Sequence, residues 1–204
     1  RDMDREIQMI RYICKGEQGE GFMPCFSYYG GRYVKVTGIE EAQATEDLVA
    51  FSEQSSVLRR MGSFYCSDEY ANKTFENTLR SDYSNFYYFP TDCPHREKSG
   101  WTGDVALSSE QLCLLLDCEK SLRMWLSCLR DCQKENGALP CIVPTGGWGY
   151  GWGSGPSWDS VIAFTPYMLY RYTGHKEILE ENADTIYKYL GFLRSIRNDK
   201  GTID

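Results

Sequence analysis

Histidine is scarce in this sequence, and the residue types that bind zinc do not occur in zinc-binding patterns. His95 and His175 are the two histidines among 204 residues, and the nine cysteines include no Cys-x-x-Cys pair. Structural zinc sites are usually built from four such ligands at close spacing. We therefore predict no metal site and no cofactor.

Long apolar runs and clusters of positive charge are also absent. No apolar stretch approaches the roughly 20 residues that a membrane-spanning helix needs. The Lys and Arg residues are scattered, and the formal net charge is −7 with a pI of about 5.0, whereas nucleic-acid binding favours a basic face. These absences argue against a membrane protein and against a nucleic-acid partner.

The sequence shows neither an export signal nor the cysteine pattern of a disulfide framework. Residues 1–5 carry charges where a signal peptide would carry apolar residues. Nine is an odd number of cysteines, and several fall at apolar positions of helical patterns, as buried free thiols do. We predict free thiols and a cytoplasmic location.

A glycine-rich run at residues 146–155 contains no lysine. A phosphate loop lies between a strand and a helix and usually ends near a lysine, so nucleotide binding is not favoured. Two interpretations remain open for this run, which contains Trp148 and Trp152. It is either a plain connector or a loop that places aromatic side chains over a pocket.

Apolar residues recur at helical spacing through the second half of the chain. The third pattern contains Pro166, where we expect a kink, and should end at Gly174. Asp104 precedes the first pattern and would make a reasonable N-cap. Helices joined by short turns, with glycine-rich loops between pairs, are typical of helical arrays and α/α barrels. The four patterns begin at Val105, Leu122, Trp158 and Leu179.

The first third of the chain has a different character. Residues 22–36 are rich in Tyr, Phe and Val around Gly30-Gly31, which predicts two strands and a hairpin turn. Residues 43–66 allow further short strands. A β segment of this size is too small for an independent sandwich, and a closed barrel needs more helices than the second half supplies. We therefore expect the chain to be a fragment.

Residues 91–104 gather three carboxylates, two cations and a tryptophan into one short segment with no clean period. Such charges are costly to bury without partners, which favours a site over core or linker. Cleavage of a glycosidic bond needs one protonated and one ionised carboxyl group. Asp92, Glu97 and Asp104 are candidates for the protonated one, because clustered acids favour protonation. Arg96 and Lys98 would oppose this effect if they point inward.

Two interpretations of this segment remain open from the residues alone. In the first it belongs to a carbohydrate site, where aromatic rings cover the apolar face of a sugar. In the second the rings pack helix ends, and Asp92 and Asp104 cap helix N-termini. The aromatic residues concerned are Trp101, Trp148, Trp152, Trp158, Tyr87 and Tyr88.

Residues 92–97 and 100–104, Asp-Cys-Pro-His-Arg-Glu and Gly-Trp-Thr-Gly-Asp, resemble the signature of bacterial α-L-rhamnosidases, glycoside hydrolase family 78. Residues 26–36 resemble the strand pair that precedes this signature in the family. Residues 158–174 resemble the downstream helix. The resemblance covers most of residues 22–195.

The resemblance implies a fold and an activity. The fold class is mainly α, a partial (α/α)6 barrel preceded by a few antiparallel β-strands from a β-sandwich domain. Residues 1–66 would be the end of the sandwich, and residues 67–204 the N-terminal part of the catalytic barrel. The implied activity is inverting hydrolysis that removes terminal α-L-rhamnose, with a rhamnose-containing glycoside as the partner.

The same resemblance assigns roles to residues. Glu97 matches the general acid, and His95 stands where the family commonly has Gln. The family's general base is a Glu in the second half of the barrel, which matches no position among these 204 residues. The chain is therefore expected to lack the general base and to be inactive alone. The residues that match sugar-binding positions are Asp92, Arg96, Trp101, Asp104 and Trp158.

Two other functions compete with this one. A non-catalytic carbohydrate-binding module would keep the aromatic pocket without hydrolysis. A helical scaffold would show self-similarity at a period of about 34 to 47 residues, which the sequence lacks. An open barrel face would expose apolar surface, so association, including as a homo-oligomer, is also expected.

Overall fold

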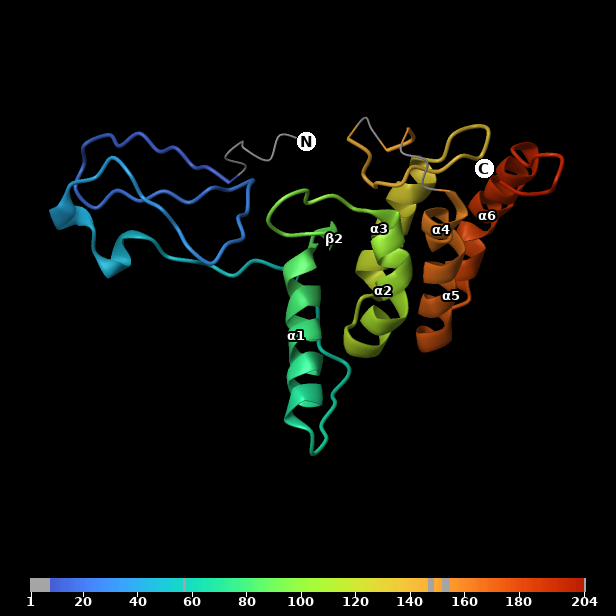
Figure 1. Cartoon of the computed structure of the whole chain (residues 1–204), viewed down its shortest axis with the longest axis horizontal. Helices are drawn as coiled ribbons and strands as arrows, with labels where there is room; N and C mark the ends of the chain where they lie inside the picture. The colour runs from blue at the N-terminus through green and yellow to red at the C-terminus, as the bar shows by residue number, and fades with distance from the viewer. Residues whose placement is uncertain (1–7, 57, 147–148, 152–154, 204) are drawn as a thin grey trace.

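The computed structural model describes residues 8–56, 58–146, 149–151 and 155–203. A group of helices forms one part of the molecule, and an extended N-terminal segment leads away from it (Figure 1). No helix among these residues is long and apolar enough to cross a membrane. The helical elements are η1 (Glu41–Gln43), η2 (Glu46–Leu48), α1 (Glu69–Asn85), α2 (Thr102–Leu115), α3 (Glu119–Asp131), α4 (Gly155–Asp159), α5 (Val161–Thr173) and α6 (Glu177–Ser195).

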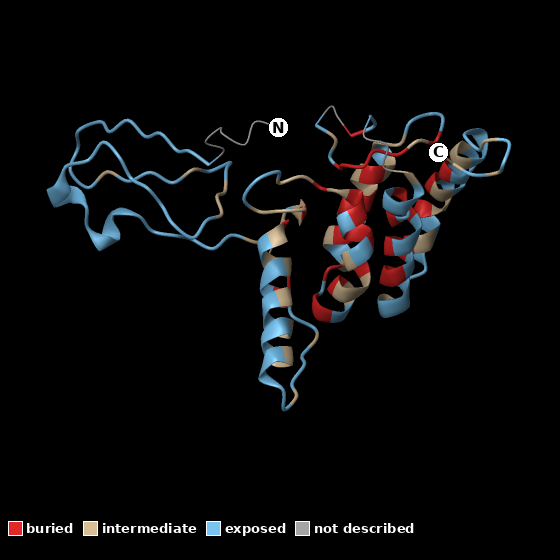
Figure 2. Cartoon of the chain, in the orientation of Figure 1, coloured by how far each residue is buried: buried red, intermediate tan, exposed pale blue. Residues whose placement is uncertain are grey.

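The core lies among α2, α3, α5 and α6. α2 packs chiefly against α5, α5 packs against α6, and α3 contacts both α5 and α6. Buried residues concentrate in these helices (Figure 2). The Trp125 indole is fully buried, and its Nε1 donates to the Val143 carbonyl at 2.9 Å. α3 contributes its apolar face completely, through Leu122, Trp125, Leu126 and Leu129.

The contact between α2 and α5 includes a buried polar pair. The hydroxyls of Ser109 and Thr165 lie 2.6 Å apart, and both residues are fully buried. Ser109 Oγ also bonds the Val105 carbonyl of its own helix at 2.6 Å. Small hydroxyl residues satisfied in this way let two helices approach without leaving an unpaired polar group.

The helices predicted from the apolar period form, with differences at their N-termini. Gly174 ends α5 with a left-handed backbone, φ 77°, as glycine does at helix ends. The third pattern divides at Ser160 into α4 and α5, and α5 continues through Pro166. The prediction that Asp104 is an N-cap is wrong. Trp101 holds that position, and Asp104 is an acidic residue inside the first turn.

α1 is not among the helices predicted from the spacing of apolar residues. Leu79 is its one buried residue, so it shows no apolar period. Its N-cap is Asp68, whose carboxylate accepts from the N–H groups of Tyr70 and Ala71 at 2.8 and 3.1 Å. Near its other end, Gln111 of α2 donates to Asp82 at 2.6 Å. A capped, mostly exposed helix therefore lies beside α2.

Two short strands lead from α1 toward the charged segment. β1 (Phe86–Tyr87) and β2 (Phe89–Pro90) pair antiparallel. Tyr88 forms the turn between them with φ 69°, a left-handed conformation uncommon outside glycine. Their pairing reverses the chain after α1 and directs it toward α2.

The N-terminal segment, residues 8–56, contains no strand. The strands predicted within residues 22–36, and the hairpin turn at Gly30-Gly31, do not form. A two-stranded hairpin is marginal in water and needs further strands or a packed helix to be stable. Most of this segment is exposed, so the alternating apolar residues have nothing to pack against.

All nine cysteines are free thiols in the structure, but most of them are not buried as the sequence predicted. Cys118 and Cys141 are buried, whereas Cys14 and Cys25 in the N-terminal segment are exposed. Cys118 packs into the hydrophobic core as a small apolar residue, whereas the Cys141 thiol donates to the Gly149 carbonyl at 2.8 Å.

Candidate active site

The charged segment forms a closed loop between β2 and α2. Asp92 and Ser99 close it with two hydrogen bonds: the Asp92 N–H donates to the Ser99 carbonyl, and the Ser99 N–H donates to Asp92 Oδ1, both at 2.9 Å. Inside this closure, the Lys98 N–H donates to the Cys93 carbonyl at 3.2 Å. The tip of the loop, residues 95–97, is exposed. Asp92 therefore shapes the loop and does not cap a helix.

Glu97 is held by the tryptophan that follows it. Trp101 Nε1 donates to Glu97 Oε2 at 2.9 Å. The carboxyl group is exposed, so this bond orients it without removing it from solvent. An exposed carboxyl group in a fixed direction is suited to exchanging a proton with a bound molecule.

The base of the loop is anchored by a second chain segment that follows α3. The Val143 N–H donates to the Gly100 carbonyl at 2.8 Å, and the Thr102 N–H donates to the Cys141 carbonyl at 2.9 Å. A Cβ at Gly100 would lie 1.9 Å from the Val143 carbonyl oxygen. Glycine is required there because the two backbones approach too closely for any side chain.

Trp158 of α4 lies against the first turn of α2. A Cβ at Gly103 would fall 2.5 Å from the Trp158 ring. The absence of that atom lets the indole lie against the backbone of Gly103, and the Trp158 residue remains 40% exposed. A partly exposed indole can cover the apolar face of a sugar.

Two carboxylates of the segment, those of Asp92 and Glu97, act on the third, that of Asp104. Partial burial of the Asp104 carboxyl group raises its pKa, and the negative charges of Asp92 and Glu97 add to that rise. Like charges within reach of each other favour the protonated form. The acids that were predicted to cluster are therefore close enough in the structure to interact.

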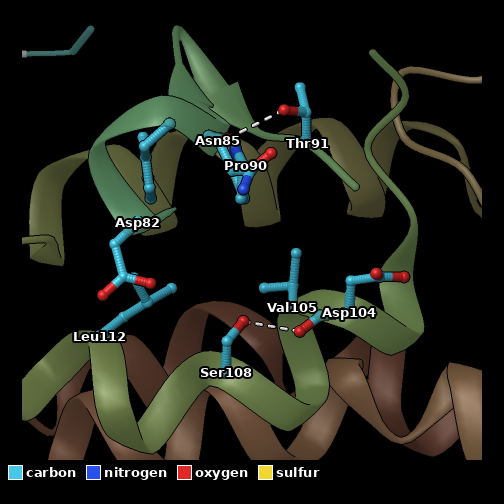
Figure 3. Close-up of a pocket in the computed structure, with 9 residues that line it drawn as sticks. Asp82, Asn85, Pro90, Thr91, Asp104, Val105, Ser108 and Leu112 are labelled. Carbon is cyan, nitrogen blue, oxygen red and sulfur yellow. Dashed lines mark hydrogen bonds between the residues drawn. The ribbon is translucent and has the colours of Figure 1, made fainter. Parts of the chain in front are cut away.

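A small pocket lies behind Asp104, between α1 and α2 (Figure 3). Its volume of about 50 Å³ can hold water, whereas ligand pockets usually reach about 300 Å³ or more. Burial raises the pKa of Asp82 to about 6, against a hydrogen bond from Gln111 that lowers it. Figure 3 shows the Asp104 carboxylate turned away from Asp82. This pocket is therefore too small for a ligand of that size.

The structure brings most of the predicted site residues to one end of α2. Arg96 is exposed at the tip of the loop, next to Glu97. Trp148 and Trp152 lie outside the described residues. In the part of the chain that the structure describes, no group of three His, Cys, Asp or Glu side chains could hold a metal ion. The residues brought together are Asp92, Glu97, Trp101, Asp104 and Trp158.

Asp159, the neighbour of Trp158, has a structural partner. It is 4% exposed, and the Tyr189 hydroxyl donates to its Oδ2 at 2.8 Å. Burial and this carboxylate raise the pKa of Tyr189. Asp159 therefore ties α4 to α6 and so fixes the position of Trp158.

Sequence reasoning missed the contribution of the N-terminal segment. The Lys98 ammonium lies 4.5 Å from the ring centre of Tyr28 and 5.1 Å from that of Tyr29. It also donates to the Tyr28 carbonyl. These residues are 70 positions apart, and no local pattern connects them. The only signal was the concentration of tyrosine before Gly30.

The helices and this loop match a known class of domain. Residues 59–203 match the model of the bacterial alpha-L-rhamnosidase 6 hairpin glycosidase domain, and residues 1–52 match that of the bacterial alpha-L-rhamnosidase concanavalin-like domain. The class is thus a helical six-hairpin glycosidase. The chain belongs to the bacterial α-L-rhamnosidase family.

Individual relatives agree with this assignment. An α-L-rhamnosidase of Formosa agariphila is 31% identical over 205 residues, which cover 97% of this chain and 22% of the relative. One of Alteromonas sp. is 30% identical over 194 residues, 94% of this chain and 21% of the relative. The chain thus spans about a fifth of the length of these relatives.

Solved structures give the same answer for the fold. The α-L-rhamnosidase from Dictyoglumus thermophilum has a TM-score of 0.66 and 36% identity, over 70% of this chain and 16% of that one. The enzyme of Streptomyces avermitilis, complexed with L-rhamnose, has a TM-score of 0.66 and 26% identity, over 71% of this chain and 14% of that one. The predicted mainly α class, a partial α/α barrel, is confirmed.

Proposed function

We propose that the protein of which this chain is part removes terminal α-L-rhamnose from rhamnosides, with Glu97 as general acid. The observation that carries this proposal is the exposed Glu97 carboxyl group, oriented by a hydrogen bond from Trp101 and near enough to Asp104 for its charge to raise the pKa of that group. In the reaction Glu97 gives a proton to the glycosidic oxygen as its bond to the sugar breaks. The aglycone leaves as a neutral alcohol, and Glu97 becomes ionised.

We assign sugar binding to the residues around Glu97. Asp104 would accept hydrogen bonds from sugar hydroxyls, and the Trp158 indole would cover the C–H face of the ring. Arg96 would donate to hydroxyls from the tip of the loop. The Streptomyces avermitilis relative, solved with L-rhamnose, supports rhamnose as the sugar. Asp92 and Trp101 complete the proposed set, the first through the loop that it closes.

We further propose that the reaction inverts the anomeric centre and that its general base is a residue outside residues 1–204. Inversion needs two carboxyl groups roughly 6.5–9.5 Å apart, with a water molecule between the second one and the sugar. The resemblance of residues 92–104 to the family signature supplies the acid alone. The 204-residue chain by itself should therefore show no turnover of a rhamnoside, and clear turnover would contradict this part of the proposal.

The direct test of the function is Glu97→Gln in the complete protein. Loss of a general acid typically lowers the rate by about 10²- to 10⁴-fold, so kcat for a rhamnosyl disaccharide should fall within that range. Binding of L-rhamnose, measured by calorimetry, should persist. Glu135→Gln, an exposed change beyond α3, is the matched control. Unchanged hydrolysis in the Glu97 variant would instead favour a carbohydrate-binding module.

Exposed apolar side chains on α2 and α5 support a proposal about association. α2 and α5 expose large apolar side chains, Leu107 at 88%, Leu114 at 52% and Tyr167 at 48%. Exposed apolar surface of this kind favours contact with another surface. We propose that the isolated 204-residue chain self-associates through it, which analytical ultracentrifugation would detect as a mass above 23.5 kDa.

We also propose that the protein works in a reducing compartment, namely the cytoplasm. Its nine free thiols, two of them exposed, support this location because oxidising compartments favour disulfides. Cell fractionation tests it, and recovery of the protein outside the cell with oxidised cysteines would contradict it.

A further inference from the structure

We propose that Lys98, Tyr28 and Tyr29 form a clamp that positions Glu97 for proton transfer, so that the N-terminal segment takes part in catalysis. The inference rests on the proposed role of Glu97 and adds positioning residues that touch neither the sugar nor the reacting atoms. We call these three residues the clamp.

The clamp is made by one cation between two rings. The Lys98 ammonium lies 4.5 Å from the Tyr28 ring centre and 5.1 Å from the Tyr29 ring centre, within the range of cation–π attraction. The same ammonium donates to the Tyr28 carbonyl. Burial lowers the pKa of Lys98, as expected for an ammonium partly covered by the two rings. Three contacts therefore hold one side chain.

The tyrosines are themselves held in place. The Tyr28 ring packs against Tyr87 of β1, with ring centres 4.6 Å apart. Gly30 is fixed by Gln8, which accepts from its N–H at 2.8 Å and donates to its carbonyl at 2.6 Å. A Cβ at Gly30 would lie 3.4 Å from the His95 Cβ, so the segment rests on the loop that carries Glu97. Residues 28–30 are partly buried in an otherwise mostly exposed segment.

The clamp acts at the residue next to the general acid. Lys98 has a left-handed backbone, φ 53°, which a residue with a side chain keeps only when its surroundings enforce it. Glu97 is also held through its own backbone, because its N–H donates to Cys93 Sγ at 3.2 Å. Release of the Lys98 side chain would free this turn to relax, and the direction of the Glu97 carboxyl group would change with it.

A misplaced acid has a specific kinetic consequence. A poor leaving group, such as the alcohol of a disaccharide, must be protonated as the bond breaks, whereas an acidic phenol leaves with little assistance. Damage to the position of Glu97 should therefore slow the first kind of substrate and spare the second. General damage to the fold or to sugar binding would slow both kinds equally.

The test is Lys98→Met in the complete protein, with Lys98→Arg as the conservative variant and Lys73→Met on exposed α1 as the matched control. For Lys98→Met we expect kcat on a rhamnosyl disaccharide to fall about tenfold or more, and kcat on 2,4-dinitrophenyl α-L-rhamnoside to change by less than about twofold. KM for both substrates should stay near the wild-type value. Lys98→Arg should keep most of the activity, because guanidinium also stacks on aromatic rings.

A second pair of variants protects the test if Lys98→Met fails to fold. Tyr29→Leu should reproduce the selective loss, and Tyr29→Phe, which keeps the ring, should not. Three outcomes would overturn the clamp. The variants could lose activity equally on both substrates, or lose it on neither. Alternatively, both conservative variants, Lys98→Arg and Tyr29→Phe, could show the same loss as Lys98→Met and Tyr29→Leu.

Glu97→Gln separates the two proposals. If Glu97→Gln does not lower kcat more on the disaccharide than on the dinitrophenyl rhamnoside, Glu97 is not the acid. The proposed function then fails together with the clamp. If Glu97→Gln shows the loss and the clamp variants do not, the clamp alone is wrong.

Discussion

The helices and the N-terminal segment differ in how much of their structure they can form by themselves. α2, α3, α5 and α6 satisfy their backbone groups internally and bury a shared core. Residues 8–56 carry a strand-like sequence yet form no strand. A helix bonds to itself, whereas a strand needs a neighbour that is often distant in sequence. The contrast shows that the same chain can hold one region that is locally specified and one that depends on partners.

The largest expected effect compares an aromatic residue from each region. Trp125→Ala removes a fully buried indole and leaves the Val143 carbonyl without its donor, so unfolding should become easier by about 3–5 kcal/mol. Phe26→Ala removes a ring that is fully exposed and should change stability by less than about 0.5 kcal/mol. Urea unfolding measures both. A large loss from Phe26→Ala would show that the segment has a packed core after all.

Glycines give the next comparison. Gly100→Ala would place a Cβ 1.9 Å from the Val143 carbonyl oxygen, and forced overpacking costs typically about 1–3 kcal/mol. The pairing of residues 100 and 143 should loosen, so hydrolysis should fall along with the melting temperature. Gly21→Ala meets no atom within 4 Å and should be neutral. Equal tolerance at the two positions would contradict the close backbone approach.

Capping residues should show a smaller difference. Asp68→Ala leaves two N–H groups of α1 without their acceptor and should cost about 1 kcal/mol. Glu40 belongs to a capping box on η1, a three-residue helix with no buried residue, so Glu40→Ala should have no measurable effect. Thermal melting of both variants checks this expectation. Equal decreases in melting temperature for the two variants would contradict this expectation.

The smallest expected effect depends on pH. Burial raises the pKa of Asp82 from 3.8 to about 6, so this carboxyl group favours folding fully below about pH 4, and the contribution is lost as pH rises through about 6. Asp82→Asn should therefore be more stable than wild type at about pH 7.5, by a few tenths to about 1 kcal/mol after allowance for partial exposure. Near pH 4 the two should agree.

The control for this pH effect is Asp47→Asn in η2, an exposed change in the N-terminal segment. Its stability relative to wild type should not vary between about pH 4 and about pH 7.5. Urea unfolding at the two pH values measures the difference for each variant. A constant difference for Asp82→Asn would mean that its carboxyl group is not buried as the structure has it.

Much of the helical region could be predicted because its signals are local. The apolar period located α2, α3 and α6, and Gly174 marked the end of α5. α1 gave no such period because it buries Leu79 alone. Asp104 was misassigned as a cap because its spacing to the apolar residues fits a cap and a first turn equally well.

The candidate site could be predicted in its residues but not in their arrangement. Glu97 and Trp101 are four positions apart, but the segment between them is not helical, so their contact could not be predicted from the spacing. The closure of the loop by Asp92 and Ser99 combines one backbone hydrogen bond with one to the Asp92 side chain, and the residue pattern did not indicate either. The contact of Lys98 with Tyr28 joins two regions of the molecule, and only tertiary structure could place it.

The hydrogen bond from Trp101 makes the two oxygens of Glu97 unequal. An indole N–H is a donor only, so the oxygen that faces it, Oε2, must keep a lone pair in that direction. A proton on this carboxyl group therefore favours Oε1. If Glu97 is the acid, the proton leaves from that single oxygen, and the side of the carboxyl group that Oε1 faces sets where a glycosidic oxygen must arrive to receive it.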